Sequence, residues 1–268
     1  IIIYVILTIL AIMTLIPVSI MISTSLKSKA EMVSNLGIIP RKIKWDNYIK
    51  LWRETNLLSF FKNSVIVSIA TVLPVLFFSS LAGFAYSRLV FPMRKIIYYT
   101  TLTGLMLPVH VTLVPLFQII KRFNLINTYP ALIGPYIAFG LPFGIFIFKN
   151  YIDTIPYDLD DAAKIDGCSS FGIYWRIILP VIRPALATLL ILQFLTSWNE
   201  FIFALIFMTE NAMKTLPLAV MVFRASFLIS AYNKLFAGLC IISMPVLIVY
   251  LIFQKEFIKG LTAGALKG

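Results

Sequence analysis

The chain has 268 residues, of which 60% are hydrophobic and 13% are charged, and its formal net charge is +12. Soluble domains hold about 45–50% apolar and about 25% charged residues, so this composition excludes a soluble globular protein and indicates an integral membrane protein. The basic residues flank apolar segments instead of forming one patch, which argues against nucleic-acid binding. Two cysteines, Cys168 and Cys240, give neither a disulfide framework nor a metal-ligand spacing.

We expect an all-α integral membrane fold with six transmembrane helices, because a helical crossing needs about 20 mainly apolar residues. The alternating pattern of barrel strands is absent. The six segments are 1–22, 63–87, 96–120, 131–148, 184–208 and 235–253. The sequence opens with IIIYVILTIL and no methionine, so we expect residues before Ile1 to be missing; a signal peptide is not expected, since no small-residue cleavage site closes the first segment.

The first connection, 23–62, is long for a membrane protein and is expected to be functional or interfacial. Its stretch WDNYIKLWRE places aromatic and apolar residues at near-helical spacing: Trp45, Tyr48, Leu51 and Trp52. This stripe argues against disorder. Either the loop forms a binding surface, or its tryptophans anchor an interfacial helix.

The third and fourth segments carry helix-breaking residues. Pro108 and Pro115 interrupt the third, and the fourth, ALIGPYIAFGLPFGIFIF, holds three glycines and two prolines. Such residues are tolerated within a helix bundle, so two interpretations stay open. The fourth helix is either kinked for close packing, or it borders a cavity that opens and closes.

A second polar segment, 149–183, is expected to form two short helices that meet at a glycine. Pro156 and the acids after it favour a helix start, Gly167 a helix end, and Ser169 or Ser170 the cap of a second helix. The acids are Asp158, Asp160 and Asp161, and the expected bundle-facing residues are Phe171, Tyr174, Trp175 and Ile178. With no positioned partner for its acids, this surface is better suited to a protein contact than to catalysis. The alternative is a solvated helix without a partner.

The motif in this segment resembles a known one. Asp161-Ala162-Ala163, then Gly167, then Ile177-x-Leu179-Pro180 reproduce the EAA motif of ABC importer permeases, with aspartate where glutamate is usual. The phrases SLKSKAE, MLPVHVTLVPLF, SWNEFIFAL and QKEFIKGLTAGALKG are similar to the maltose-type, carbohydrate-transporting branch. The resemblance covers essentially the whole chain.

This resemblance implies a single permease domain over 1–268, with an external loop at 23–62, a cytoplasmic EAA loop at 149–183 and a C-terminal tail at 254–268. The EAA loop would form a cytoplasmic coupling helix between transmembrane helices four and five. It implies a second similar permease subunit, two cytosolic ATPase subunits and an extracellular solute-binding protein as partners, besides membrane lipid. The chain itself would be no enzyme and hold no cofactor, with ATP and magnesium on the ATPase subunits. The implied ATPase contacts are Asp161, Ala162, Ala163, Asp166, Gly167, Gly260 and Thr262.

The same resemblance implies the cytoplasmic (inner) cell membrane, with both termini in the cytoplasm. Charge does not decide this orientation. In that arrangement the external side holds 13 Lys and Arg residues and the cytoplasmic side holds 10. The positive-inside rule expects the excess on the cytoplasmic side, so the count argues slightly against this orientation. The orientation therefore follows from the resemblance alone.

Polar residues within the crossings are candidates for a substrate cavity. Glu200 is the one charged residue inside an expected crossing, and Trp198 and Asn199 beside it form a cluster of the kind that stacks on and hydrogen-bonds a sugar. His110, the single histidine, lies between two prolines. The alternative is that Glu200 binds a neighbouring helix or water, and that His110 is hydrogen-bonded to a neighbour.

Other functions fit the sequence less well. A proton-coupled transporter needs acid–histidine or acid–base relays, and an intramembrane enzyme needs a nucleophile–base set or a metal motif; the sequence supplies no such set, and no phosphate loop. An ABC permease for a polyol, a glycerol phosphate ester or a peptide stays open. Because no Lys or Arg lies inside an expected crossing, a neutral sugar is favoured.

Overall fold

The computed structural model describes residues 2–35, 37–227 and 232–265, and every regular element in those ranges is helical. The all-α membrane fold is thereby confirmed. Five helical segments are long and apolar enough to cross a membrane, and a sixth is obtained if one bent pair counts as a single span. The spanning helices are α1 (Ile2–Ser25), α4 (Leu57–Arg88), α7 (Pro130–Ile152), α11 (Arg183–Asn199) continued by α12 (Ile202–Phe207), and α14 (Tyr232–Ala265).

Shorter elements connect these spans. The α-helices are α2 (Lys29–Ser34), α3 (Asp46–Glu54), α5 (Arg94–Thr103), α6 (Leu113–Arg122), α8 (Asp158–Ile165), α9 (Ser170–Ile173), α10 (Leu179–Val181) and α13 (Leu216–Phe227). Three 3₁₀ turns, Gly104–Met106, Val109–Thr112 and Asn211–Met213, and one π-helical turn, Tyr174–Ile178, complete the set.

The chain forms two compact units. Residues 1–63 and 210–247 make the first, and residues 64–209 and 248–268 make the second. The first unit contains α1, whose most apolar 18-residue window has no buried residue. An apolar helix this exposed is suited to contact with lipid or with another membrane helix.

Buried amides hold together the folded first connection within the first unit. The Asn47 amide donates to the carbonyl oxygens of Ser25 at 2.7 Å and Lys27 at 3.0 Å, and the Asn233 amide donates to Asn47 Oδ1 at 2.8 Å. The expected aromatic stripe lies on α3, with Trp45 as the N-cap residue of this helix; Trp45 and Trp52 are exposed whereas Leu51 is buried. The stripe therefore divides between the core and the surface.

In the second unit, α7 packs between α4 and α11. A Cβ added to Gly144 of α7 would lie 2.5 Å from Ser79 Oγ of α4 and 2.8 Å from Leu189 Cδ2 of α11, so the missing side chain permits this close approach. Buried residues of the same three helices and of the α8–α10 segment form one core: Val75, Phe84, Phe148, Ile152, Ala163, Tyr174, Ile178, Ile182 and Leu189.

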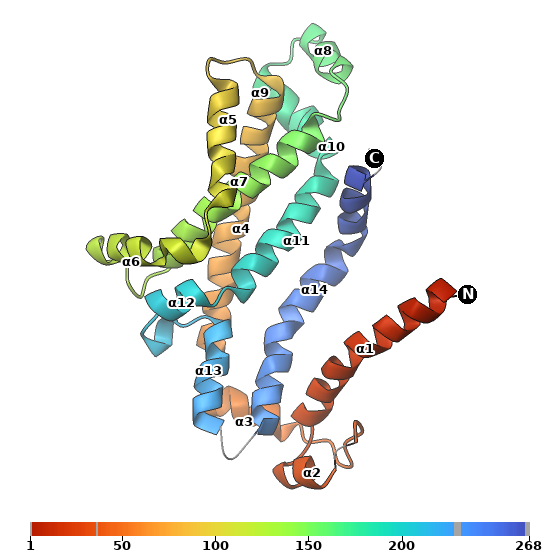
Figure 1. The fold of residues 1–268 in the computed structure, drawn as a ribbon, viewed down its shortest axis with the longest axis vertical. Helices are drawn as coiled ribbons and strands as arrows, with labels where there is room; N and C mark the ends of the chain where they lie inside the picture. The colour runs from red at the N-terminus through yellow and green to blue at the C-terminus, as the bar shows by residue number, and fades with distance from the viewer. Residues whose placement is uncertain (1, 36, 228–231, 266–268) are drawn as a thin grey trace. The chain divides into compact units, whose positions relative to one another are not determined.

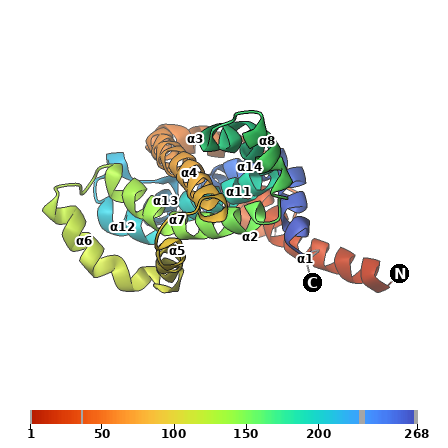
Figure 2. The same ribbon diagram turned by 90° about the horizontal axis from the view of Figure 1, so that it is seen from above.

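Two expected crossings are interrupted. The third bends by 91° between Met106 and Val109, so that α6 turns away from α5 (Figures 1 and 2). Pro108 accounts for the bend, because it lacks an N–H donor and forces Leu107 before it into an extended conformation (φ −79°, ψ 115°). The fifth breaks at Glu200, which is extended between α11 and α12. The expected crossings over 96–120 and 184–208 therefore each consist of two helical pieces.

Candidate functional site: a cavity and a polar loop

A cavity of about 230 Å³ lies in the second unit, where α7 meets α11 and α12. Its lining is mostly aromatic, with a few polar groups. The lining residues are Val109, Tyr136, Phe139, Gly140, Phe143, Gln193, Thr196, Ser197, Glu200 and Phe203. Phe203 stacks with Tyr136 and Phe139, with ring centroids 6.2 and 6.0 Å apart. The fourth segment therefore does border a cavity, although its prolines also lie in a continuous, closely packed helix.

Glu200 lines this cavity, but its carboxylate already has hydrogen-bond partners. It accepts hydrogen bonds from the Tyr136 hydroxyl, from the Phe203 N–H at 2.7 Å and from the Ala204 N–H at 3.2 Å. Those two N–H groups belong to the first turn of α12, where a helix leaves donors unpaired and favours negative charge. Glu200 thus joins the two halves of the broken crossing, as in the alternative that it binds a neighbouring helix.

Gln193 is the polar group of the cavity that is left for a ligand. The residue is 5% exposed and lines the cavity, and within the described residues its amide makes no side-chain hydrogen bond. A buried amide without a partner is costly, and it offers both donors and an acceptor. A Cβ added to Gly140 would lie 2.6 Å from Gln193 Oε1, so the amide rests directly on the backbone of α7.

The other residues expected in the cavity lie elsewhere. Trp198 is 1% exposed and stacks on Phe194 at 5.3 Å, whereas Asn199 and His110 are exposed, and none of the three lines the cavity. Glu200 therefore lines the cavity without Trp198 and Asn199, its neighbours in the sequence.

Several cavity residues carry no charge and therefore did not stand out in the sequence. Tyr136, Phe139, Gly140 and Phe143 recur at helical spacing, as do Gln193, Thr196, Ser197 and Glu200. That spacing places each set on one face of its helix. The lone polar residue in LLILQFL, Gln193, was the available signal.

The polar loop has the predicted elbow. Helix α8 carries Asp158, Asp160 and Asp161 in its first turn and is followed by Gly167 with φ +79°, a left-handed conformation suited to glycine. Ser169 caps α9, accepting a hydrogen bond from the Gly172 N–H at 3.2 Å. Local sequence signals were sufficient for this turn.

The acids of α8 do not form one unpartnered face, which corrects the sequence interpretation. Asp160 is buried and lies 2.6 Å from Arg88 of α4. Asp161 is exposed and pairs with Lys164 at 2.8 Å within the helix, and this hydrogen bond raises the pKa of the Lys164 ammonium above its ordinary range. Ala162 is exposed, whereas Ala163 packs into the core, so the alanines face opposite ways.

An exposed surface, here named the α8 outer face, remains on this helix. It comprises Asp161, Ala162, Ile165 and Asp166, and Gly167 follows it, also exposed. Ile165 is 87% exposed, which is unusual for a large apolar side chain beside carboxylates. This combination of apolar and acidic groups is suited to a protein contact.

The aromatic residues after the elbow are divided by the π-helical turn. Tyr174 is buried and shares a 2.8 Å hydrogen bond with Ser80 of α4, and Ile178 is buried beside it. Trp175 lies 6.4 Å from the Phe77 ring but is half-exposed, and Phe171 is 60% exposed. The expected aromatic face packs on the bundle mainly through Tyr174.

Two further predicted residues, Gly260 and Thr262, fall in the stretch of α14 whose side chains lie outside the described residues. Among the residues that are described, no three His, Cys, Asp or Glu side chains are grouped as metal ligands.

The sequence of this chain also matches a known protein family. Residues 75–262 match the model of the family described as the binding-protein-dependent transport system inner membrane component. This chain belongs to that family. It is therefore a multi-pass membrane permease of the ABC transporter class, and the matched region includes both the cavity and α8.

Similar proteins include named sugar permeases. The permease is 36% identical to the arabinooligosaccharides transport system permease protein AraQ of Bacillus subtilis (strain 168), over 97% of this chain and 92% of AraQ. It is 37% identical to the trehalose/maltose transport system permease protein MalG of Thermococcus litoralis, over 90% of this chain and 88% of MalG. A crystal structure of a bacterial ABC transporter that imports the acidic polysaccharide alginate has the same fold, with a TM-score of 0.78, 21% identity, and coverage of 95% of this chain and 94% of that one.

Proposed function

We propose that this permease is one membrane subunit of an ATP-driven importer that carries a neutral sugar or oligosaccharide delivered by an extracellular binding protein. The names of its relatives support a carbohydrate. The observation that carries the proposal is the cavity between α7 and α11, where aromatic rings surround the unpartnered Gln193 amide.

The chemistry of the cavity fits a neutral polyhydroxylated ligand. The rings of Phe139 and Phe203 offer apolar faces to a sugar ring, and the Gln193 amide can both donate to and accept from its hydroxyl groups. No Lys or Arg lines the cavity, and Glu200 would repel an anion. The class of ligand is therefore neutral, in contrast to the acidic polysaccharide of the alginate importer.

The size of the cavity supports a second permease subunit. Cavities for small molecules hold about 300–1,000 Å³. The cavity of this chain holds about 230 Å³, so it supplies part of a site that a homologous subunit would complete.

The α8 outer face is proposed as the contact with two cytosolic ATPase subunits, which would bind ATP and magnesium. Exposed Ile165 and the carboxylates of Asp161 and Asp166 support a groove with apolar walls and basic groups as its counterpart. With this contact, we propose that α8, the 149–183 loop and both chain termini lie on the cytoplasmic side of the cell membrane and that the 23–62 loop lies outside. Gly260 and Thr262 remain proposed ATPase contacts on the basis of the resemblance.

Uptake by the reconstituted transporter tests the proposal. We expect Gln193→Leu to raise the half-saturating concentration of a labelled arabino-oligosaccharide or maltotriose by about tenfold, since a hydrogen bond left unmade costs about 1–3 kcal/mol. Gln118→Leu on α6 is the matched control, because Gln118 is exposed and does not line the cavity. Equal uptake by both variants, or uptake of an anionic sugar only, would contradict the proposed ligand class.

A further inference from the structure

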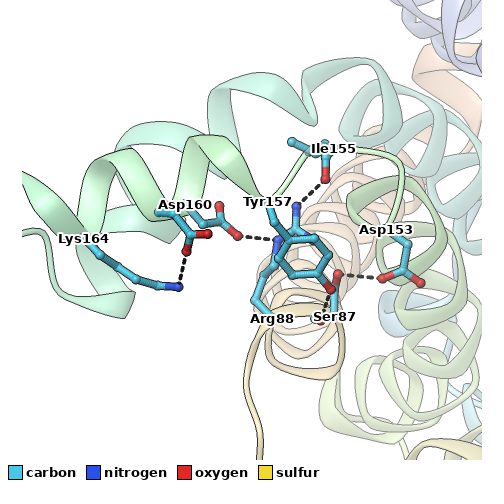
Figure 3. Close-up of polar contacts among 8 residues, drawn as sticks. Ser87, Arg88, Asp153, Ile155, Tyr157, Asp160 and Lys164 are labelled. Carbon is cyan, nitrogen blue, oxygen red and sulfur yellow. Dashed lines mark hydrogen bonds and ion pairs between the residues drawn. The ribbon is translucent and has the colours of Figure 1, made fainter.

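The last residue of α4, Arg88, is buried against the segment that leads into α8 (Figure 3). Its Nε lies 2.6 Å from Asp160 Oδ2, and its Nη2 donates to the Ile155 carbonyl oxygen at 2.7 Å. The Tyr157 ring covers the guanidinium, whose carbon lies 4.0 Å from the ring centroid. One α4 side chain therefore contacts three residues of the α7–α8 connection and of α8 itself.

The neighbouring residue of α4 reinforces these contacts. Ser87 Oγ donates to Asp153 Oδ1 at 2.6 Å, and the Tyr157 hydroxyl donates to the Ser87 carbonyl oxygen at 3.2 Å (Figure 3). We name this group of contacts the Arg88 clamp. It consists of Ser87, Arg88, Asp153, Ile155, Tyr157 and Asp160.

The Arg88 clamp connects α8 to α4, a helix that does not adjoin α8 in the sequence. Helix α8 is connected through the backbone to α7 on one side and to the α9–α11 segment on the other, whereas α4 ends well before either. Without the clamp, the first turn of α8 would be attached to α4 only through the shared core, in which Ala163 lies. The Arg88 clamp attaches the first turn of α8 to the end of α4 as well.

The two faces of α8 are therefore specialised. Asp160 and Ala163 face inward, the first held by Arg88 and the second packed in the core, whereas Asp161 and Ile165 face outward. The outward residues form the proposed ATPase contact. The inward residues connect that contact to the membrane helices.

We propose that Arg88 and Asp160 are positioning residues that make the end of α4 move together with α8 when the ATPase subunits close. This inference rests on the proposed function of the α8 outer face. A buried ion pair is suited to this task because its energy depends on the distance between the charges and is weakly screened by water. Arg88 Nε and Nη1 and Asp160 Oδ1 are buried without a hydrogen-bond partner among the described residues, so the ion pair itself is what joins these two side chains.

The attachment can be tested on the full chain in lipid nanodiscs, without any ATPase. We expect Asp160→Asn to accelerate amide hydrogen exchange in residues 157–163 by about tenfold or more, because the first turn of α8 loses its attachment. Asp158→Asn is the matched control: Asp158 lies in the same helical turn but is exposed, with no bonded side-chain partner in the described structure. Equal exchange in both variants would overturn the clamp.

Transmission is tested in the complex with the ATPase subunits, with Mg²⁺–ATP as the probe. A double variant, Arg88→Met with Asp160→Leu, keeps the site filled and leaves no buried charge, so it guards against misfolding of the single variant. In wild type and in Asp158→Asn we expect Mg²⁺–ATP to change exchange at both residues 158–166 and residues 80–88. In the double variant we expect the first change to persist and the second to fall by about tenfold.

The outcomes separate this inference from the proposed function. A double variant whose α4 end still responds to Mg²⁺–ATP as in wild type would show that packing alone transmits the movement, and would overturn the role of the ion pair. A wild-type complex without any response at residues 158–166 would instead refute the proposed ATPase contact, and the transmission claim with it. The exchange measured without ATPase would still decide whether the clamp attaches α8.

Discussion

The carboxylates of Asp160, in the first turn of α8, and of Glu200, between α11 and α12, are held by different kinds of partner. Asp160 is held by a positive charge, the Arg88 guanidinium at 2.6 Å, and both side chains are almost fully buried. Glu200 is held by neutral donors, the Tyr136 hydroxyl and two N–H groups of α12. Substitution of the two acids should therefore have different consequences. Removing the Asp160 carboxylate leaves a buried cation without its partner, whereas neutralising Glu200 leaves only neutral groups without a hydrogen-bond partner.

The largest expected effect is therefore at Asp160. Asp160→Asn should lower the free energy of unfolding by about 3–5 kcal/mol, because it leaves the buried Arg88 charge without its partner. Thermal unfolding in detergent, followed by near-ultraviolet circular dichroism, measures the change. The Arg88→Met, Asp160→Leu double variant should recover most of the loss, and a loss equal to that of the single variant would show that the unpaired charge is not its cause.

A smaller effect is expected at Glu200. Glu200→Gln keeps an acceptor for some of its three donors and should cost about 1–3 kcal/mol, the range for leaving a buried neutral group unpaired. Tyr136→Phe should cost less, and a double-mutant cycle should reveal coupling between the two residues. Additive effects of the two substitutions would contradict the Tyr136–Glu200 contact.

A third acid, Glu31 in the first unit, has a carboxylate whose main partner is a backbone N–H group. The Arg41 N–H and the Asn35 amide donate to its carboxylate, and the first of these bonds lowers the pKa of Glu31 below its ordinary value of 4.5. Because the folded pKa is depressed, the stabilisation is present above pH 4.5 and is lost as the pH falls through the folded pKa. The protection factor of the Arg41 amide, which is corrected for the intrinsic pH dependence of exchange, should fall over that acidic range, and in Glu31→Gln it should not change with pH over that range.

The smallest effect on stability is expected at Asp161, next to Asp160. Its bond to Lys164 is exposed, and exposed pairs contribute little. Asp161→Asn should leave thermal unfolding unchanged while weakening ATPase association, which quantitative co-purification would detect. A stability loss as large as that of Asp160→Asn would contradict the assignment of the two aspartates to opposite faces.

Features that depend on residues close together in the chain could be predicted from the sequence. The elbow at Gly167, the acidic first turn of α8 and the cap at Ser169 rest on residues a few positions apart, so composition and spacing predict them. The EAA spacing further indicated the family. The first segment was equally readable, because an apolar run of this length has few alternatives to a helix.

Features that depend on distant partners were missed or misjudged. Nothing near Asp160 in the sequence points to Arg88, so its carboxylate was taken as unpartnered. A bond from Glu200 to a neighbouring helix was one of two interpretations, but nothing near Glu200 identifies Tyr136 as the partner. Pro108 signalled a disturbance of the third crossing, but not a bend of 91°. The cavity itself arises where two helices meet, although Gln193 and its helical spacing were visible in the sequence.

We propose that the α8 outer face is the surface through which ATP hydrolysis acts on the permease. Photo-crosslinking in intact membranes tests it most directly, with the crosslinker in place of Ile165 (87% exposed) and, as a control, of Val33 on α2 (85% exposed). We expect the position-165 probe to capture an ATPase subunit, identified by mass spectrometry, and the position-33 probe to capture none. Capture of the ATPase at position 33 but not at position 165 would contradict the account.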